Sequence, residues 1–155
     1  MGRAEASVEV PGLASEAEAL WYDPIRWPAF IDGFGHLVEI SQEWPVSGTA
    51  VWNSAPGGRE RVIERVEAYE PRAGQTLAVE DSRVRGTQRV AFTPGSDHTK
   101  VTLSLDYEIK ERTPVTWLVD LLFVRRAVVA SLRRTLARFA RERRGDMELE
   151  AVSSR

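Results

Sequence analysis

KVTLSLDYEIK, at residues 100–110, is the stretch of sequence that most directly indicates the fold. Apolar and polar side chains alternate along it with a period of two, which is typical of a β-strand with one buried and one wet face. The row predicted to face inward consists of Val101, Leu103, Leu105, Tyr107 and Ile109. The stretch therefore predicts an antiparallel sheet that covers a core on one side only.

Short apolar segments separated by turn residues precede this strand. Pro94 to Asp97 read as a hairpin turn, because proline, glycine, serine and aspartate favour turns. Residues 59–70, RERVIERVEAYE, could be a helix by composition, but Pro71 and the flanking turns favour a strand. The other predicted strands are residues 4–10, 35–44, 48–55, 75–82 and 86–93.

After the strand, the apolar period changes to that of a helix. Thr113 and Pro114 form a helix cap with a first-turn proline, and no further breaker occurs before Gly145. The predicted helix is about 30 residues long, roughly 45 Å at 1.5 Å per residue. Its apolar stripe is predicted to be Leu118, Leu122, Val129, Leu132, Leu136 and Ala140. Residues 145–155 are predicted to form a flexible C-terminal tail.

Two short helices are predicted near the N-terminus. Ser15 and Glu18 fit a capping box, and this helix must end before Pro24. Asp23 can cap a second helix that has Pro24 at its first position. The segment WYDPIRWPAFIDGFG at residues 21–35 is unusually aromatic for such a broken region.

This order of elements resembles the helix-grip fold of the START/SRPBCC superfamily, and in particular its polyketide cyclase/dehydrase-like family. The resemblance rests on WYDPIRWPAFIDGF, on VEAYEP ending at Pro71, on VTLSLDYEI and on DLLFVRRAVVASLRRTLARFA. It covers about residues 4–143 and implies an α+β fold in which a curved antiparallel sheet wraps around the long helix. It also implies a cavity between sheet and helix, closed at one end by the two short helices.

Composition narrows the possible classes of protein. The 155 residues fit a single domain, which we expect over residues 1–144. A net charge of −2 gives no bulk attraction to nucleic acid, and the arginines of the long helix are spread around it rather than gathered in one stripe. The absence of cysteine excludes disulfides and zinc–sulfur sites. Nineteen arginines against two lysines hint at a GC-rich, bacterial genome.

We expect no cofactor, no metal, no secretion signal and no stable membrane insertion. No segment has the apolar core of a signal peptide, and the longest apolar window is too short to span a bilayer. The expected location is the cytoplasm. The expected partner is a small hydrophobic molecule, and a homodimer is left open.

Arg125 is the candidate that stands out, because it lies in the apolar stripe of the long helix, one heptad from Leu118 and Leu132. A charge there is predicted to be partly buried and paired, first with Glu64 or Asp81. It could bind a carboxylate or polarised oxygen of a ligand, or form a purely structural ion pair. Glu80 is a further possible partner for it, and Arg126 a substitute.

The other candidate ligand-binding residues come from the two layers around the cavity that the resemblance implies. Trp27 and Phe30 would lie at its mouth, or would plug the end of the core instead. Gln88 could orient a ligand if its strand face points inward, which the sequence leaves open. Tyr107 needs a partner for its hydroxyl group. The remaining candidates are Trp52, Phe92, Leu105, Leu122 and Val129.

Three functions compete at this point. The first is a non-catalytic carrier or sensor of a hydrophobic ligand. The second is a cofactor-independent enzyme of the cyclase/dehydrase kind, in which Glu64 and Asp81 could act as an acid/base pair if both faced one cavity. The third is a partner-regulating module with a vestigial cavity. No strong acid/base constellation is visible, so the first is favoured.

Overall fold

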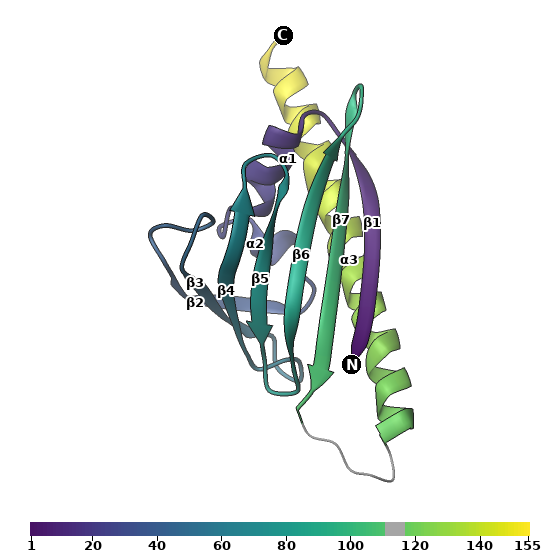
Figure 1. The fold of residues 1–155 in the computed structure, drawn as a ribbon. Helices are drawn as coiled ribbons and strands as arrows, with labels where there is room; N and C mark the ends of the chain where they lie inside the picture. Colours follow the sequence, from purple (N-terminus) through teal and green to yellow (C-terminus); the bar gives the residue numbers. More distant parts are fainter. Residues whose placement is uncertain (111–116) are drawn as a thin grey trace.

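The structure is a computed structural model and describes residues 1–110 and 117–155. Seven antiparallel strands form one curved sheet in the order β1-β7-β6-β5-β4-β3-β2 (Figure 1). The strands are β1 (Gly2–Pro11), β2 (Phe34–Ile40), β3 (Thr49–Ser54), β4 (Arg61–Glu70), β5 (Gly74–Glu80), β6 (Val84–Pro94) and β7 (His98–Ile109). The helices are α1 (Ala14–Trp21), α2 (Trp27–Phe30) and α3 (Trp117–Ser153). This arrangement confirms the predicted α+β helix-grip fold, including the strand predicted at residues 59–70.

The alternation in β7 decides which face of the sheet is buried. Val101, Leu103, Leu105 and Tyr107 are all buried, as predicted. We call the side of the sheet that carries them the inner face. In an antiparallel ladder, residues directly opposite one another point to the same side. Gln88 is opposite Leu105 and therefore belongs to the inner face, which resolves the orientation that the sequence left open.

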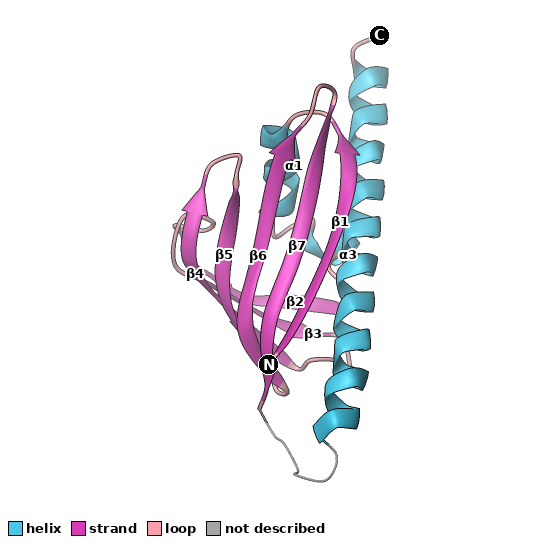
Figure 2. Cartoon of the chain, turned by 45° about the vertical axis from the view of Figure 1, so that its right-hand side comes forward, coloured by secondary structure: helices cyan, strands magenta, loops and turns pink. Residues whose placement is uncertain are grey.

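The long helix α3 covers the inner face along the edge strand β1 (Figure 2). Leu132, Leu136, Phe139 and Ala140 are its main buried apolar residues. The Phe139 ring lies 5.3 Å from those of both Trp21 and Phe30, so α3 packs against both short helices. The core is therefore concentrated at the end of the sheet where α1, α2 and the second half of α3 meet.

The predicted end of α3 at residue 144 is wrong, because the helix continues through Gly145 to Ser153. A glycine inside a helix costs only about 1 kcal/mol relative to alanine. Arg26 offsets this cost by bonding Glu142 before the glycine and Asp146 after it, each at 2.9 Å. The predicted cap at Thr113 and Pro114 lies outside the described residues.

The short helices differ from their predicted starts. No side-chain cap opens α1, and Glu18 instead accepts a hydrogen bond from the backbone N–H of Arg72 at 2.7 Å. The predicted capping box is therefore not formed. Asp23 accepts the backbone N–H of Ile25 at 3.0 Å and organises a turn, so that α2 begins only at Trp27. In both places the carboxylate accepts a hydrogen bond from a backbone N–H outside the helix terminus that it was predicted to cap.

Candidate functional site

The inner face carries an unusual set of polar side chains where it is farthest from α1. Glu64 is opposite Val79, Val79 is opposite Gly86, and Gly86 is opposite Tyr107, so the four form one row across β4 to β7. The row is polar at both ends and apolar or bare in the middle. Trp52 lies beside it on β3, on the same face.

Two of these side chains bury a hydrogen-bonding atom that has no partner within the described part of the chain. They are the indole nitrogen of Trp52 and the hydroxyl of Tyr107, and each residue is only 1% exposed. Buried polar atoms are nearly always hydrogen-bonded, so an unpartnered one calls for an explanation such as a bound water or ligand. Both unpartnered atoms lie on the face that α3 covers.

Glu64 is 7% exposed and is surrounded on its face by apolar neighbours. Burial raises the pKa of its carboxyl group above the ordinary value; the Arg59 charge and the Trp52 indole N–H oppose this rise without cancelling it. Although that N–H acts on the Glu64 pKa, it meets hydrogen-bond geometry with no described atom. The environment therefore shifts the equilibrium of this group toward the neutral acid, relative to a carboxyl group in water.

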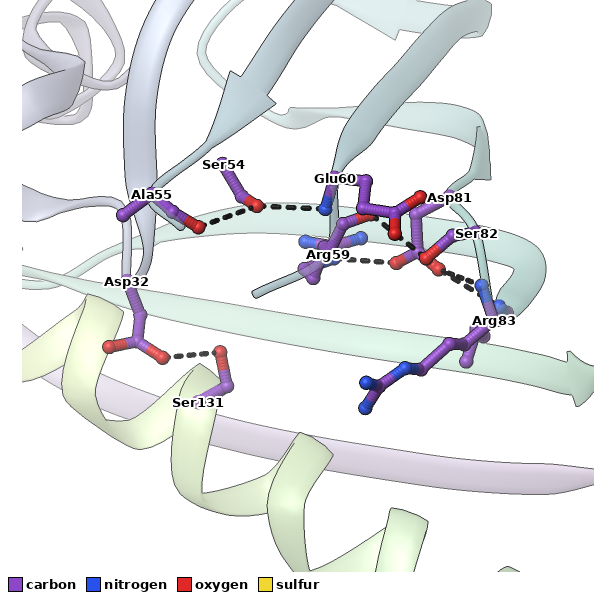
Figure 3. A network of polar contacts seen from close by, with 10 residues as sticks. Asp32, Ser54, Ala55, Arg59, Glu60, Asp81, Ser82, Arg83 and Ser131 are labelled. Atoms are coloured by element: carbon purple, nitrogen blue, oxygen red, sulfur yellow. Dashed lines mark hydrogen bonds and ion pairs between the residues drawn. The ribbon is translucent and has the colours of Figure 1, made fainter. Parts of the chain in front are cut away.

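Arg59 is the cation that pairs with a carboxylate of the inner face. Its Nε atom donates to Asp81 at 2.6 Å (Figure 3). Its Cζ atom lies 5.5 Å from the centre of the Trp52 ring. Asp81 also accepts the backbone N–H groups of Arg83 and Val84. Sequence reasoning missed Arg59. It precedes β4 just as Asp81 follows β5, and antiparallel pairing brings those two ends together.

Arg125 does not occupy the predicted position. Its side chain is exposed, and no ion pair within the described residues includes it. Burial raises the pKa of Tyr107, and the Arg125 charge lowers it, so Arg125 lies near the Tyr107 end of the row without being buried there. The predicted burial and the predicted pairing with Glu64 or Asp81 are wrong. The stripe of apolar residues shows which side of the helix is apolar, but not which part of the helix the sheet covers. The first turns of α3 extend past the end of β1 (Figure 1).

The remaining predicted residues fall into three groups. Leu105 is buried on the inner face, while Gln88 beside it is half-buried. Phe92 is buried at the other end of the sheet, where its ring lies 6.1 Å from that of Tyr22. Leu122 is exposed, so the structure does not bring it to the row, whereas Val129 is half-buried against the core.

Trp27 and Phe30 both point inward and are buried. The Trp27 indole donates to the backbone oxygen of Trp21 at 2.9 Å, and its ring contacts that of Trp44. Phe30 lies between Trp21 and Phe139. These contacts favour the plug over the cavity mouth.

α3 is fastened to the rest of the chain from its middle onward. Asp32 accepts a hydrogen bond from Ser131 (Figure 3). It also accepts hydrogen bonds from Arg134 and Arg138. Burial alone would raise the pKa of Asp32, but the hydrogen bonds from Arg134 and Ser131 and the nearby arginine charges outweigh it, so the pKa lies below its ordinary value. Arg143, with a side chain 3% exposed, donates to Glu16. Arg143 is a buried cation of α3 that sequence reasoning did not single out.

The sheet and α3 do not pack closely against one another in the part of α3 that precedes Ser131. Apolar side chains that face inward remain partly exposed on both layers. On the sheet these are Phe34, Leu37, Val66 and Val84, and on α3 they are Val124, Val128 and Val129. Residues 122–130 of α3 therefore leave apolar side chains of both layers partly exposed beside the buried polar row.

A hollow of about 390 Å³ lies on the opposite, outer face of the sheet. Charged side chains such as Arg65, Glu80, Arg85 and Glu108 line much of it. Glu80 pairs with Lys110 at 2.5 Å and Arg85 with Glu108 at 3.5 Å. Because these groups satisfy one another or face solvent, we place the candidate site on the inner face instead.

Two kinds of feature were searched for in residues 1–110 and 117–155. No group of three histidine, aspartate or glutamate side chains there could hold a metal ion. Nor is any helix in that part of the chain long and apolar enough to cross a membrane.

Comparison with known proteins gives one family and many similar folds. A family model described as "Polyketide cyclase / dehydrase and lipid transport" matches residues 1–143. No curated protein matches the sequence.

Three solved structures illustrate the similarity of fold. The protein TTHA0849 from Thermus thermophilus is 16% identical with a TM-score of 0.78, over 94% of this chain and 99% of its own. The Zhui aromatase/cyclase from a Streptomyces species is 12% identical with a TM-score of 0.74, over 92% and 93%. A START superfamily protein from Mycobacterium smegmatis is 18% identical with a TM-score of 0.59, over 85% and 96%. At these identities the likeness concerns the fold alone.

Proposed function

The chain belongs to the polyketide cyclase/dehydrase and lipid transport family, and from this premise we propose that it binds one small hydrophobic molecule as a carrier or sensor. The family match confirms the resemblance inferred from the sequence. The proposed place of binding is the space between the inner face of the sheet and residues 122–130 of α3. The ligand would be aromatic, polyketide-like or lipid-like.

The observation that carries this proposal is the partial exposure of inward-facing apolar side chains on both layers. Small-molecule sites are concave, mostly apolar, and carry a few polar groups that orient the ligand. Val66 and Val84 on the sheet and Val128 on α3 supply the apolar lining. The unpartnered atoms of Trp52 and Tyr107 supply polar groups that a ligand could satisfy.

Native mass spectrometry and calorimetric titration with a panel of aromatic, polyketide-like and fatty compounds test the proposal. We expect a one-to-one complex with at least one of them. Val66→Trp should abolish binding by filling the space, because Val66 is half-buried on the inner face. Val38→Trp is the matched control, since Val38 is exposed on β2, two strands away in the sheet. Failure of the whole panel to bind, or equal binding by both variants, would contradict the proposal.

The second candidate is a cyclase/dehydrase-type enzyme without a cofactor, and the buried Glu64 is the observation that favours it. A carboxyl group whose pKa is raised by burial can act as a general acid. Asp81 is less suited to a role in proton transfer, because Arg59 and two backbone N–H groups already occupy it. Deuterium uptake at an enolisable carbon of a bound ligand, lost in Glu64→Gln, would identify the enzyme. Binding without exchange would identify the carrier.

A further inference from the structure

Glu64 is the buried polar group of the inner face whose role the fold leaves unexplained. The residue is 7% exposed, and the Trp52 indole N–H lies near enough to lower the pKa of its carboxyl group without meeting hydrogen-bond geometry. Val62 and Val66 flank it on its own strand, and Ala50 and Val79 lie opposite it on the neighbouring strands. A carboxyl group in such surroundings costs free energy unless something polar meets it.

The nearby cation does not supply that partner. Arg59 directs its Nε atom to Asp81 at 2.6 Å and stacks its guanidinium over the Trp52 ring. Its charge is therefore already balanced by Asp81. Glu64 is left with the electrostatic effect of Arg59 but without a described bond to it.

The unpartnered groups next to Glu64 can donate hydrogen bonds. An indole N–H is a donor only, and a neutral carboxylic acid carries one O–H donor. The Trp52 indole and Glu64 lie on the same face of adjacent strands, two residues apart in register, because Trp52 is opposite Val62 and Ala50 is opposite Glu64. A carbonyl oxygen that lay against both groups could accept a hydrogen bond from each.

We propose that the Glu64 carboxyl group and the Trp52 indole N–H bind the carbonyl oxygen of a neutral, apolar ligand. The inference rests on the proposed function and names its ligand class: ketones, quinones, esters and related uncharged carbonyl compounds. A carboxylate ligand is disfavoured, because Asp81 has already neutralised Arg59 and a second buried anion would remain unpaired. The ligand recognition first predicted for Arg125 is thereby replaced.

The row across the sheet gives the site its extent. Glu64 and Tyr107 are separated by three strand spacings, or roughly 14 Å between Cα atoms. Gly86 lies between Val79 and Tyr107 in the row, so no side chain covers the backbone at that position. A Cβ atom there would clash with the backbone oxygen of Asp106, so this position of the ladder requires glycine. A flat molecule of two or three fused rings is shorter than this distance and can lie along the row with its carbonyl group at Glu64.

The test compares 9-fluorenone with fluorene, which differ by one carbonyl group on the same ring system. Calorimetric titration of the wild-type protein should show about 3- to 10-fold tighter binding of fluorenone, as a net gain of one hydrogen bond implies. Glu64→Gln keeps an N–H donor and should keep the preference. Glu64→Leu should lose most of it while binding fluorene at least as tightly as wild type. Glu67→Leu, on the exposed side of the same strand, is the control and should behave as wild type.

A spectroscopic measurement keeps the test independent of whether Glu64→Leu folds. The infrared carbonyl band of fluorenone bound to the wild type should shift to lower frequency than in hydrocarbon solvent, as hydrogen bonding requires. The shift should persist in Glu64→Gln and shrink in Glu64→Leu. An unshifted band in the wild-type complex would overturn the inference without any variant.

The outcomes also separate this inference from the proposed function. Equal one-to-one binding of fluorenone and fluorene by the wild type overturns the carbonyl site but leaves hydrophobic binding standing. A preference that survives unchanged in folded Glu64→Leu overturns the role of Glu64 in the same way. If neither compound binds, the carbonyl site is wrong, and a panel in which nothing binds removes the proposed function as well.

Discussion

The guanidinium of Arg59 lies over the ring of Trp52 while its Nε atom bonds Asp81, so one cation joins the loop before β4 to the turn after β5. Asp81 is the buried member, and Arg59 is partly exposed. The two residues therefore contribute unequally to stability.

We expect Asp81→Ala to lower the free energy of unfolding by about 2–4 kcal/mol, because it leaves two backbone N–H groups and a cation without their acceptor. Arg59→Met should cost only about 1 kcal/mol, since solvent screens a partly exposed cation. Urea denaturation of both single variants and of the double variant measures the coupling. A larger loss for Arg59→Met than for Asp81→Ala would contradict this ranking.

The pKa shift of Glu64 predicts how stability depends on pH. The folded state raises this pKa, so it binds the proton more tightly than the unfolded chain does. The stabilisation is fully present below the unfolded value of 4.5 and is lost as pH rises through the folded value. Thermal melts from pH 4 to pH 8 should show Glu64→Gln gaining stability relative to wild type as pH rises. The charged group that acts on the Glu64 pKa is Arg59, which lowers it. A constant difference between the two proteins would refute the assignment.

Asp32 should show the opposite sign. Its pKa is lowered in the folded state, so its contribution is present above the unfolded value of 3.8 and is lost as pH falls through the folded value. Asp32→Asn should therefore flatten the acid side of the stability profile and lower the free energy of unfolding by about 1–3 kcal/mol at pH 7. Glu67→Gln, an exposed carboxylate, is the control and should leave both quantities unchanged.

Trp27 should behave as a core residue. Because it is buried between Trp44 and Phe34 and donates to the backbone of Trp21, Trp27→Ala is expected to cost about 3–5 kcal/mol. Thermal melts and ligand titrations of Trp27→Ala, compared with wild type, test whether Trp27 is a core residue. A stable variant that has lost only ligand binding would restore the interpretation as a cavity mouth.

Two arginines of α3 provide a matched comparison. Arg125 is exposed, so Arg125→Met should change the free energy of unfolding by less than about 0.5 kcal/mol. Arg143 is buried and bonded to Glu16 and to the backbone oxygen of Pro11. Arg143→Met should cost about 2–4 kcal/mol, because it leaves those acceptors unpaired. Chemical denaturation of both variants tests the contrast.

The sequence predicted the sheet well because alternation along a strand is a local property. The residues from Val101 to Tyr107 that were predicted to face inward are buried. Arg125 was placed wrongly because a helical stripe does not reveal where the covering layer ends. Gly145 was read as a stop because its effect is local, whereas the bonds of Arg26 on either side of it join residues more than a hundred positions apart. Glu64 was found as a candidate, but its burial became visible only with the strand pairing.

The described part of α3 is anchored unevenly along its length. Asp32 and Glu16 accept hydrogen bonds from α3, and Arg26 donates to it, so the helix is anchored between Ser131 and Asp146, whereas no described ion pair holds residues 122–130. A helix moves most easily where few bonds hold it. A bulkier molecule beneath residues 122–130 would therefore tilt that segment rather than spread the sheet. Leu122 and Phe123 are 56% and 73% exposed on this arm. The size of the bound molecule would thus set the tilt of an apolar surface that other molecules can contact.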